Sequence, residues 1–324
     1  MPTTAVTPFT LLLLDAAGQT LLLADGPSGE IIAEYPLPQG YAAVDLIAGP
    51  GPGHAFVTLA GHSGAGALCK IDLTARAADH PVVPFPLPHP VQFSLAADGL
   101  TAYLADPTGV LHALDLDTAA CSAWEKPPDT AACAGLAVVG GEIHGVWEAD
   151  GGGLAAVYSP AGTLLRTCRL GVVPTSLAVA SDLLLATFTA SPASGEGLII
   201  FPPGRGDPVV VTIQCSRCAA AHPVYPAHAA TADGRTAYIA CEDSAAVAVV
   251  DLAAAAVTGT IFLGRSVSRL SLTADGRFAV ASSNANADLC LIDLVNRRPL
   301  AFTACSRELL RPSAIIDWRH GAGE

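Results

Sequence analysis

The chain is poor in charge, and above all in lysine. Of its 324 residues only 14% are charged, and Lys70 and Lys126 are its two lysines. The formal net charge of −13 disfavours non-specific binding to nucleic acid, because phosphates would be repelled. We therefore expect no nucleic-acid partner.

Long hydrophobic runs are also missing. The apolar run at residues 9–14 is six residues long, is not preceded by a basic residue and ends at Asp15. That is too short to cross a membrane or to form the core of a secretion signal. We expect no membrane insertion, and a cytoplasmic protein as the sequence stands, or an exported one if a signal segment has been removed.

Motifs of nucleophilic catalysis are absent as well. The sequence contains no Gly-x-Ser-x-Gly, and its nine histidines include no pair at the i, i+4 spacing of a metal site. The nine cysteines are odd in number and scattered, which favours a reducing compartment and buried free thiols over a disulfide framework. No catalytic residue can be named on these grounds.

What is present is a repeat. In residues 225–302 an alternating apolar strand leads twice to Thr-Ala-Asp-Gly, at 231–234 and at 273–276. The two Asp-Gly pairs are 42 residues apart, and each is followed by three further strand-like segments. Asp-Gly between alternating strands predicts a hairpin, for which we expect a type I′ turn. A four-strand unit at this period is typical of a β-propeller blade.

The same pattern of strands and turns extends along the chain. Residues 9–37 match the second, third and fourth strands of the repeat, and residues 312–318 supply the missing first strand. We predict an all-β fold, a single-domain seven-bladed β-propeller with four antiparallel strands per blade, closed by a blade that combines three N-terminal strands with one C-terminal strand. The other blades are expected near 41–88, 89–128, 133–170, 174–213, 226–264 and 267–304.

One segment carries a family resemblance. The sequence TADGRTAYIACEDSAAVAVVDLAAAAVTGTI at 231–261 resembles the YVTN-type repeat of YncE-like and, more distantly, lactonase-like seven-bladed propellers. The match covers 226–302 and 91–118 and weakens over 135–214, where Asp-Gly is replaced. The resemblance implies the fold but no single function, since this repeat serves many roles.

Aspartates recur at the ends of predicted third strands. Because an aspartate side chain bonds backbone amides two residues further on, we interpret them as turn caps and not as catalytic groups. They are Asp72, Asp115, Asp251 and Asp293. Acidic residues such as Asp106 in the loops between second and third strands are interpreted as solvated turns or arginine partners, with a hard-cation site as the alternative.

Arginines gather in the loops that link one blade to the next. A guanidinium group binds carboxylate or phosphate through paired donors, so arginines converging on a channel mouth would form a local anion site. The alternative is that each pairs with a nearby carboxylate or caps strand ends. The residues are Arg169, Arg217, Arg265, Arg269, Arg307 and Arg311.

The longest of these links contains a Cys-x-x-Cys pair. Cys215 and Cys218 are followed by His222 and His228, which together could hold zinc or form a redox pair, although one Cys-x-x-Cys is a weak signal. The alternative is two ordinary thiols in an alanine-rich loop.

Three functions follow from these features. The first is a non-catalytic binding or scaffold module that presents an Arg- and Pro-rich loop face to a protein partner or a small anionic ligand, and needs no cofactor. The second, implied by the resemblance, is a lactonase-like hydrolase of an anionic sugar or acid. The third is an accessory subunit of a redox assembly with a Cys/His metal site.

Overall fold

Apolar residues alternate along the strands, so the side chains of one strand pack into two different cores. In the first N-terminal strand, β1 (Thr10–Asp15), Leu12 and Leu14 pack on one side and Leu11 and Leu13 on the other, and all four are buried. Successive side chains of a strand point to opposite faces of the sheet. One strand therefore contributes to both junctions that its sheet makes with its neighbours.

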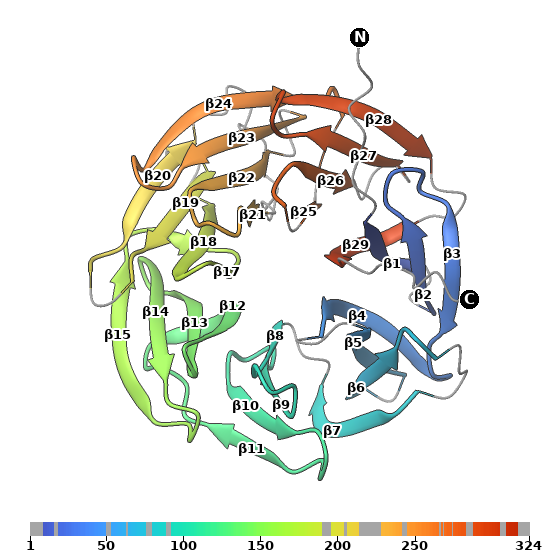
Figure 1. Cartoon of the computed structure of the whole chain (residues 1–324). Helices are drawn as coiled ribbons and strands as arrows, with labels where there is room; N and C mark the ends of the chain where they lie inside the picture. The colour runs from blue at the N-terminus through green and yellow to red at the C-terminus, as the bar shows by residue number, and fades with distance from the viewer. Residues whose placement is uncertain are drawn as a thin grey trace.

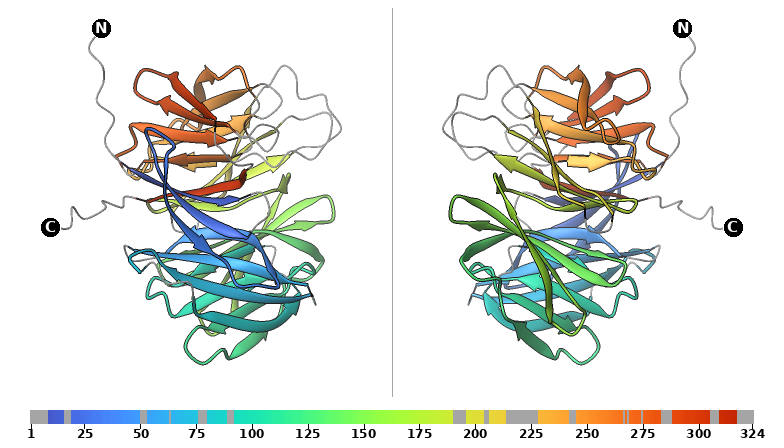
Figure 2. Two further views of the ribbon diagram at one scale, coloured as in Figure 1. Left: turned by 90° about the vertical axis from the view of Figure 1, so that its right-hand side faces the viewer. Right: turned by 90° about the vertical axis from the view of Figure 1, so that its left-hand side faces the viewer.

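The described residues of the computed structural model form seven antiparallel sheets arranged around a central axis (Figure 1). It describes residues 9–15, 19–49, 53–62, 64–75, 80–88, 92–189, 196–203, 206–213, 228–241, 245–265, 267, 269–273, 275–282, 288–304 and 309–316. The fold is the seven-bladed propeller that the sequence predicts. Side views show the blades as sectors of a thick disc (Figure 2).

We number the blades along the chain. Blade 1 is β29 (Leu309–Ile316), β1, β2 (Thr20–Asp25) and β3 (Ile31–Pro36). Blade 2 is β4 (Tyr41–Ala48), β5 (His54–Gly61), β6 (Ala65–Asp72) and β7 (Val82–Pro88). Blade 3 is β8 (Gln92–Leu95), β9 (Thr101–Ala105), β10 (Leu111–Asp115) and β11 (Cys121–Trp124). Blade 4 is β12 (Thr130–Val139), β13 (Glu142–Ala149), β14 (Gly152–Tyr158) and β15 (Leu164–Leu170).

The remaining three blades follow the same plan. Blade 5 has its innermost strand in two pieces, β16 (Val173–Pro174) and β17 (Ala178–Ala180), followed by β18 (Leu183–Thr189), β19 (Glu196–Phe201) and β20 (Val209–Ile213). Blade 6 is β21 (His228–Ala230), β22 (Thr236–Cys241), β23 (Ala246–Asp251) and β24 (Ala256–Phe262). Blade 7 is β25 (Arg269–Leu272), β26 (Phe278–Ser282), β27 (Asp288–Asp293) and β28 (Arg298–Ala304).

The ring closes within blade 1, where both ends of the chain meet in one sheet. Strand β29 pairs antiparallel with β1, from Thr10 opposite Ile316 to Asp15 opposite Leu309. The prediction of three N-terminal strands and one C-terminal strand is confirmed, and the C-terminal strand begins at Leu309, three residues before the expected 312.

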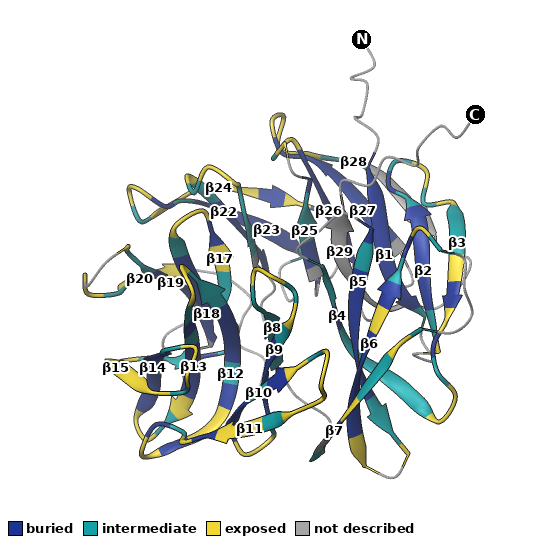
Figure 3. Ribbon diagram, turned by 60° about the horizontal axis from the view of Figure 1, so that its bottom comes forward, coloured by how far each residue is buried: buried dark blue, intermediate teal, exposed yellow. Residues whose placement is uncertain are grey.

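The described residues form seven buried apolar clusters, one for each junction between adjacent blades. Buried residues line the strands where blades face each other, whereas exposed residues gather in turns and outermost strands (Figure 3). Burial of apolar surface between blades is therefore the main force that holds the ring together.

The meander gives the disc two different faces. We call the face that carries the links between blades, together with the turns between second and third strands, the link face. The opposite face carries the turns between first and second strands and between third and fourth strands, and we call it the turn face. The described residues of the arginine-bearing links belong to the link face.

The Asp-Gly turns differ from the expected type I′ geometry. Gly234 and Gly276 have φ of 66° and 65°, but Asp233 and Asp275 are not in the positive-φ region. Instead the amide of Gly234 donates to the carbonyl of Thr231. In this turn Gly234 has a left-handed backbone conformation, and Asp233 does not. The type I′ prediction is wrong at these turns because the loops are longer than two residues.

The recurrent aspartates are turn caps, as predicted. Asp72 Oδ1 accepts from the amide of Thr74, and Asp115 Oδ1 from that of Thr118, both at 2.8 Å. Asp251 and Asp293 do the same for residues 254 and 296 at 2.9 Å. None of the described residues belongs to a helix long and apolar enough to span a membrane.

Candidate functional site

The structure describes only part of the predicted site. Arg169 and Arg265 are described with their side chains, and both lie on the link face. Arg269, Arg311 and His228 lie in β25, β29 and β21, where the backbone is described but the side chain is not. The other predicted ligands, Arg217, Arg307, Cys215, Cys218 and His222, lie outside the described residues.

Arg169 is the next-to-last residue of β15 and projects from the link face. Its side chain is 67% exposed, and Nη2 lies 4.0 Å from Oδ2 of Asp129, which is itself 74% exposed. An ion pair this long between solvated groups contributes little to stability. The guanidinium group therefore stays accessible to a further anion.

Arg265 follows β24 in the link to blade 7 and is exposed. Its charge affects the thiol of Cys290 in β27. Burial raises the pKa of Cys290 to about 12, and the positive charge of Arg265 opposes that rise. Cys290 belongs to the core between blades 6 and 7. Arg265 thus lies at the link-face end of that junction.

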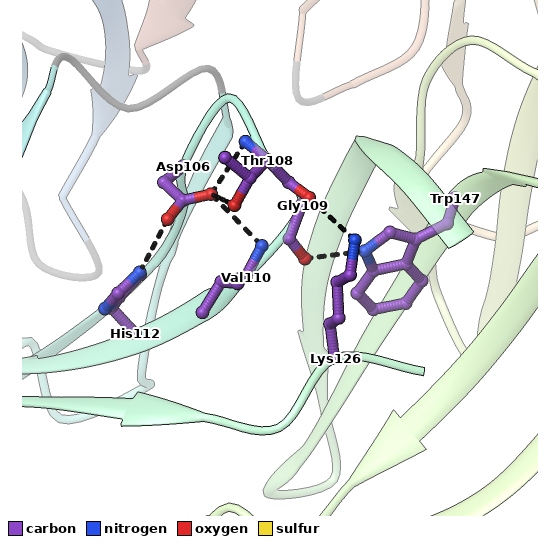
Figure 4. Close-up of polar contacts among 7 residues, drawn as sticks. All are labelled: Asp106, Thr108, Gly109, Val110, His112, Lys126 and Trp147. Carbon is purple, nitrogen blue, oxygen red and sulfur yellow. Dashed lines mark hydrogen bonds and ion pairs between the residues drawn. The ribbon is translucent and has the colours of Figure 1, made fainter. Parts of the chain in front are cut away.

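A second group of polar residues lies where blades 3 and 4 meet, and sequence reasoning did not find it. We call it the blade 3–4 corner, and it comprises the loop 106–110, His112, the link 125–130 and Trp147 (Figure 4). The loop joins the second and third strands of blade 3, so this corner is part of the link face.

Asp106 organises the loop of this corner. Its Oδ1 accepts from the Thr108 amide at 2.8 Å, the Thr108 hydroxyl at 2.6 Å and the Val110 amide at 3.1 Å. Its Oδ2 lies 3.1 Å from Nε2 of His112, whose side chain is 7% exposed. Burial alone would raise the pKa of Asp106, but the hydrogen bonds from Thr108, His112 and Val110 outweigh it and lower that pKa.

The loop is joined to blade 4 through its carbonyl groups. Trp147 Nε1 donates to the Gly109 carbonyl at 2.9 Å, and Lys126 Nζ donates to the carbonyls of Thr108 at 3.2 Å and Thr130 at 2.8 Å. Figure 4 shows the indole and ammonium groups converging on the loop from blade 4 and from the link. These bonds fix the loop to the neighbouring blade.

The core beneath this corner is aromatic. Trp124 stacks on Tyr158 with ring centroids 5.8 Å apart, and Tyr103 and Trp147 lie at 5.5 Å from Trp124 and 6.2 Å from Tyr158. The Tyr158 hydroxyl donates to the carbonyl of Glu125, at the start of the link. The link from 125 to 130 therefore rests on a well-packed base.

The Asp106–His112 pair is the part of this corner that resembles a catalytic group. In a catalytic triad, an Asp–His pair acts as the base for a serine, threonine or cysteine that is hydrogen-bonded to the histidine. Among the described residues no serine, threonine or cysteine is hydrogen-bonded to His112, and the Thr108 hydroxyl donates to Asp106. The hydrogen bonds of Asp106 to His112 and to the loop amides hold the loop in place.

The described part of the chain contains no candidate metal site. No group of three or more His, Cys, Asp or Glu side chains there could hold a metal ion. Asp106, predicted to be a solvated turn, an arginine partner or a cation ligand, is instead bound to His112 and to its own loop. The Cys/His zinc site remains a prediction, because its ligands lie outside the described side chains.

No protein-family model and no curated protein matches the chain. Solved structures resemble it over nearly its whole length at low identity. Apo AztD from Citrobacter koseri has 10% identity and a TM-score of 0.60, covering 96% of this chain and 98% of that one. Hydrazine synthase of Kuenenia stuttgartiensis has 13% identity and a TM-score of 0.65, covering 90% and 98%.

A third similar structure is dihydro-heme d1 dehydrogenase NirN in complex with DHE. It has 12% identity and a TM-score of 0.61, with 95% of this chain and 75% of that chain covered. Identities this low establish the seven-bladed propeller fold alone.

Proposed function

We propose that this propeller is a non-catalytic binding module whose link face receives a protein partner or a small anionic ligand, with no cofactor required. The observation that carries the proposal is Arg169: it is 67% exposed on that face, and 4.0 Å separates its guanidinium group from Asp129. Arg265, exposed on the same face, adds a second cation. Arg217, Arg269, Arg307 and Arg311 are proposed to complete the set.

The fixed loop of the blade 3–4 corner supports this proposal. At the blade 3–4 corner, hydrogen bonds to backbone carbonyls tie the loop 106–110 to Trp147 and Lys126. Surfaces that are ordered before binding lose little conformational entropy when a partner docks. The described part of the face thus combines one fixed loop with exposed guanidinium groups.

The strong negative charge of the chain does not oppose such a site. At physiological ionic strength, charges farther away than about 8 Å are largely screened. A guanidinium group contacts a carboxylate or phosphate directly, through two parallel hydrogen bonds. Local arginines can therefore bind an anion on a protein of net charge −13.

We also assign the chain to the YVTN-type, YncE-like propellers as a proposal. Support comes from the repeated Thr-Ala-Asp-Gly turns at 231–234 and 273–276 and from the Asp251 and Asp293 caps that follow them. These features are properties of a blade and leave the ligand open.

The test begins with native mass spectrometry of the protein purified gently from its own source. We expect a heteromeric mass or a bound anion above the 32.7 kDa of the chain. Reversing four charges together, Arg169→Glu, Arg217→Glu, Arg265→Glu and Arg307→Glu, should abolish that binding. Arg235→Glu is the matched control, because Arg235 is 83% exposed but lies on the turn face. Binding that survives the fourfold reversal would refute the proposal.

The same spectrum separates the two other functions. One of the similar structures is named as a dehydrogenase. A redox subunit with zinc held by Cys215, Cys218, His222 and His228 would show a stoichiometric metal mass that Cys215→Ser and Cys218→Ser remove. A bare monomer that hydrolyses anionic lactones without a partner would favour the lactonase-like function.

A further inference from the structure

One turn has the same backbone in three blades but different side chains in each. It joins the third and fourth strands on the turn face, and covers residues 115–120 in blade 3, 251–256 in blade 6 and 293–298 in blade 7. Its first residue is an aspartate that accepts from the amide of the fourth at 2.8, 2.9 and 2.9 Å in the three blades. Its fifth residue has a φ of 58°, 49° and 53°. The aspartate cap therefore sets this backbone in all three blades.

The side chains of the turn distinguish blade 7. The last two positions are alanines in blades 3 and 6, but Arg297 and Arg298 in blade 7. The third position is Val295, where blade 6 has Ala253. Val295 is 70% exposed, and both arginines are exposed as well. Since two alanines form the same turn, folding of the turn does not require the arginines.

The contacts of these arginines leave donors available. Among the described residues, no carboxylate forms an ion pair with Arg297 or Arg298. Arg297 Nη1 donates to the carbonyl of Thr258 in β24 at 3.3 Å, beyond the usual hydrogen-bond range. Arg298 is opposite Asp293 in the pairing of β27 with β28, but that carboxylate is buried and accepts from Asn296 at 2.9 and 2.7 Å. Most of the five N–H donors of each guanidinium group can therefore bind a further acceptor.

The two arginine side chains diverge. Arg297 reaches across to blade 6, where its Nη1 would be only 2.5 Å from a Cβ at Gly259. Residues opposite each other in an antiparallel pair share a face of the sheet, so Arg298 is on the face of Asp293 and Leu291. That face belongs to the junction with blade 1. Two separate anionic groups fit this arrangement better than one.

Exposed apolar residues accompany the arginines. Val295 belongs to the same turn, and Val257, the neighbour of Thr258 in β24, is 40% exposed. Strands β24 and β28 follow one another along the rim of the disc (Figure 1). We call these four residues the blade 6–7 patch: Val257, Val295, Arg297 and Arg298.

We propose that the blade 6–7 patch binds an acidic segment of a partner protein in which two carboxylates flank a large apolar side chain. Each arginine binds one carboxylate through paired N–H donors, and the apolar side chain covers Val295. The patch lies on the turn face, so this proposal is independent of the link-face function.

The surroundings favour a protein segment over other anions. One phosphate ion binds only one of two diverging guanidinium groups and gains nothing from an exposed valine. An anionic membrane is extended, and would also meet exposed carboxylates of the turn face on blades 3 and 5, those of Asp98, Asp117 and Asp182. A segment that covers one turn avoids these carboxylates.

The experiment titrates a short peptide into isotope-labelled protein and follows the amide signals by NMR. The probe is Gly-Glu-Leu-Glu-Gly, with both ends capped. We expect shifts at residues 293–298 and 257–259. Binding should be about fivefold or more tighter than that of the capped peptide Gly-Glu-Gly-Glu-Gly, which has the same charge but no apolar side chain.

A triple variant tests the patch itself. Val295→Ala with Arg297→Ala and Arg298→Ala gives this turn the alanines that blade 6 has, so it should fold normally and bind the probe about tenfold or more weakly. The matched control is Arg166→Ala with Arg235→Ala, which removes two positive charges from exposed arginines of the turn face that each have a carboxylate partner. The control should bind like the unmodified protein.

Three outcomes would overturn the proposal. The first is a triple variant that is folded by circular dichroism and binds the probe unchanged, and the second is equal binding of the two peptides. The third is a different occupant: inorganic phosphate that shifts the same amides as strongly as the probe, or phosphatidylserine vesicles that bind the unmodified protein but not the triple variant.

Discussion

Asp106 shows how one side chain can define a loop. Its two carboxylate oxygens accept from Thr108, Val110 and His112, and the pKa of the carboxyl lies below its ordinary value because these hydrogen bonds outweigh burial. A group whose folded-state pKa is lowered stabilises the protein above the ordinary value and loses that contribution as the pH falls through the folded-state pKa.

We predict that Asp106→Asn destabilises the protein by about 1–2 kcal/mol at pH 7, because bonds to a charged acceptor are lost and an amide group faces N–H donors. The difference between variant and unmodified protein should shrink as the pH falls below the ordinary aspartate pKa of about 4 and through the lowered pKa of the native carboxyl. Urea unfolding at several pH values measures both effects.

The matched variant is Asp129→Asn in the same corner. Asp129 is 74% exposed and its ion pair with Arg169 is long, at 4.0 Å, so its change should alter the unfolding free energy by less than about 0.5 kcal/mol. Equal effects of the two substitutions, or an Asp106→Asn effect that does not depend on pH, would contradict the role given to Asp106.

At the scale of the element, the loop between β9 and β10 depends on a close approach of two backbones. Gly109 has a φ of 83°, and a Cβ there would lie 2.1 Å from the carbonyl oxygen of Ala131 in β12. Gly151, in the corresponding turn of blade 4, has a φ of 77° but has nothing within 4 Å of the Cβ position. The two glycines have nearly the same φ, but only Gly109 has a neighbour close to its Cβ position.

We therefore predict that Gly109→Ala destabilises the protein by about 2–4 kcal/mol, from left-handed strain together with a backbone clash. Gly151→Ala should cost about 1 kcal/mol from the strain alone. Thermal or urea unfolding of both variants measures the difference, which isolates the contact with Ala131. Equal losses in the two variants would mean that the close approach is unimportant.

The elements also show what sequence could and could not predict. The Thr-Ala-Asp-Gly repeats located blades 6 and 7, and the aspartates at strand ends were correctly interpreted as caps, because these interactions span only a few residues. The turn type was wrong, since it depends on loop length. The blade 3–4 corner was missed because Trp147 and Gly109 are 38 residues apart and meet only after two blades pack.

At the scale of the whole molecule, stability depends on closing the ring. Seven apolar clusters lie between adjacent blades, and the one between blades 7 and 1 joins Leu11 and Leu13 of β1 to Phe278 and Val280 of β26. Strand β29 pairs with β1 from Thr10 opposite Ile316 to Asp15 opposite Leu309, with two register shifts, and completes blade 1. Removing it would leave one side of β1 unpaired and open the sheet at the closing junction.

We predict that a chain ending at residue 308 loses about 5 kcal/mol or more, because several buried apolar side chains near the closure become accessible to water and a strand ladder is lost. Its melting temperature should fall by roughly 10 °C, measured by circular dichroism or calorimetry. A synthetic peptide of residues 309–316, added in excess, should bind to β1 and raise the melting temperature again, since a ligand that binds only the folded chain stabilises it. A peptide of the same composition in scrambled order is the control. If truncation leaves the melting temperature unchanged, or if both peptides restore it equally, the shared blade is not what closes the ring.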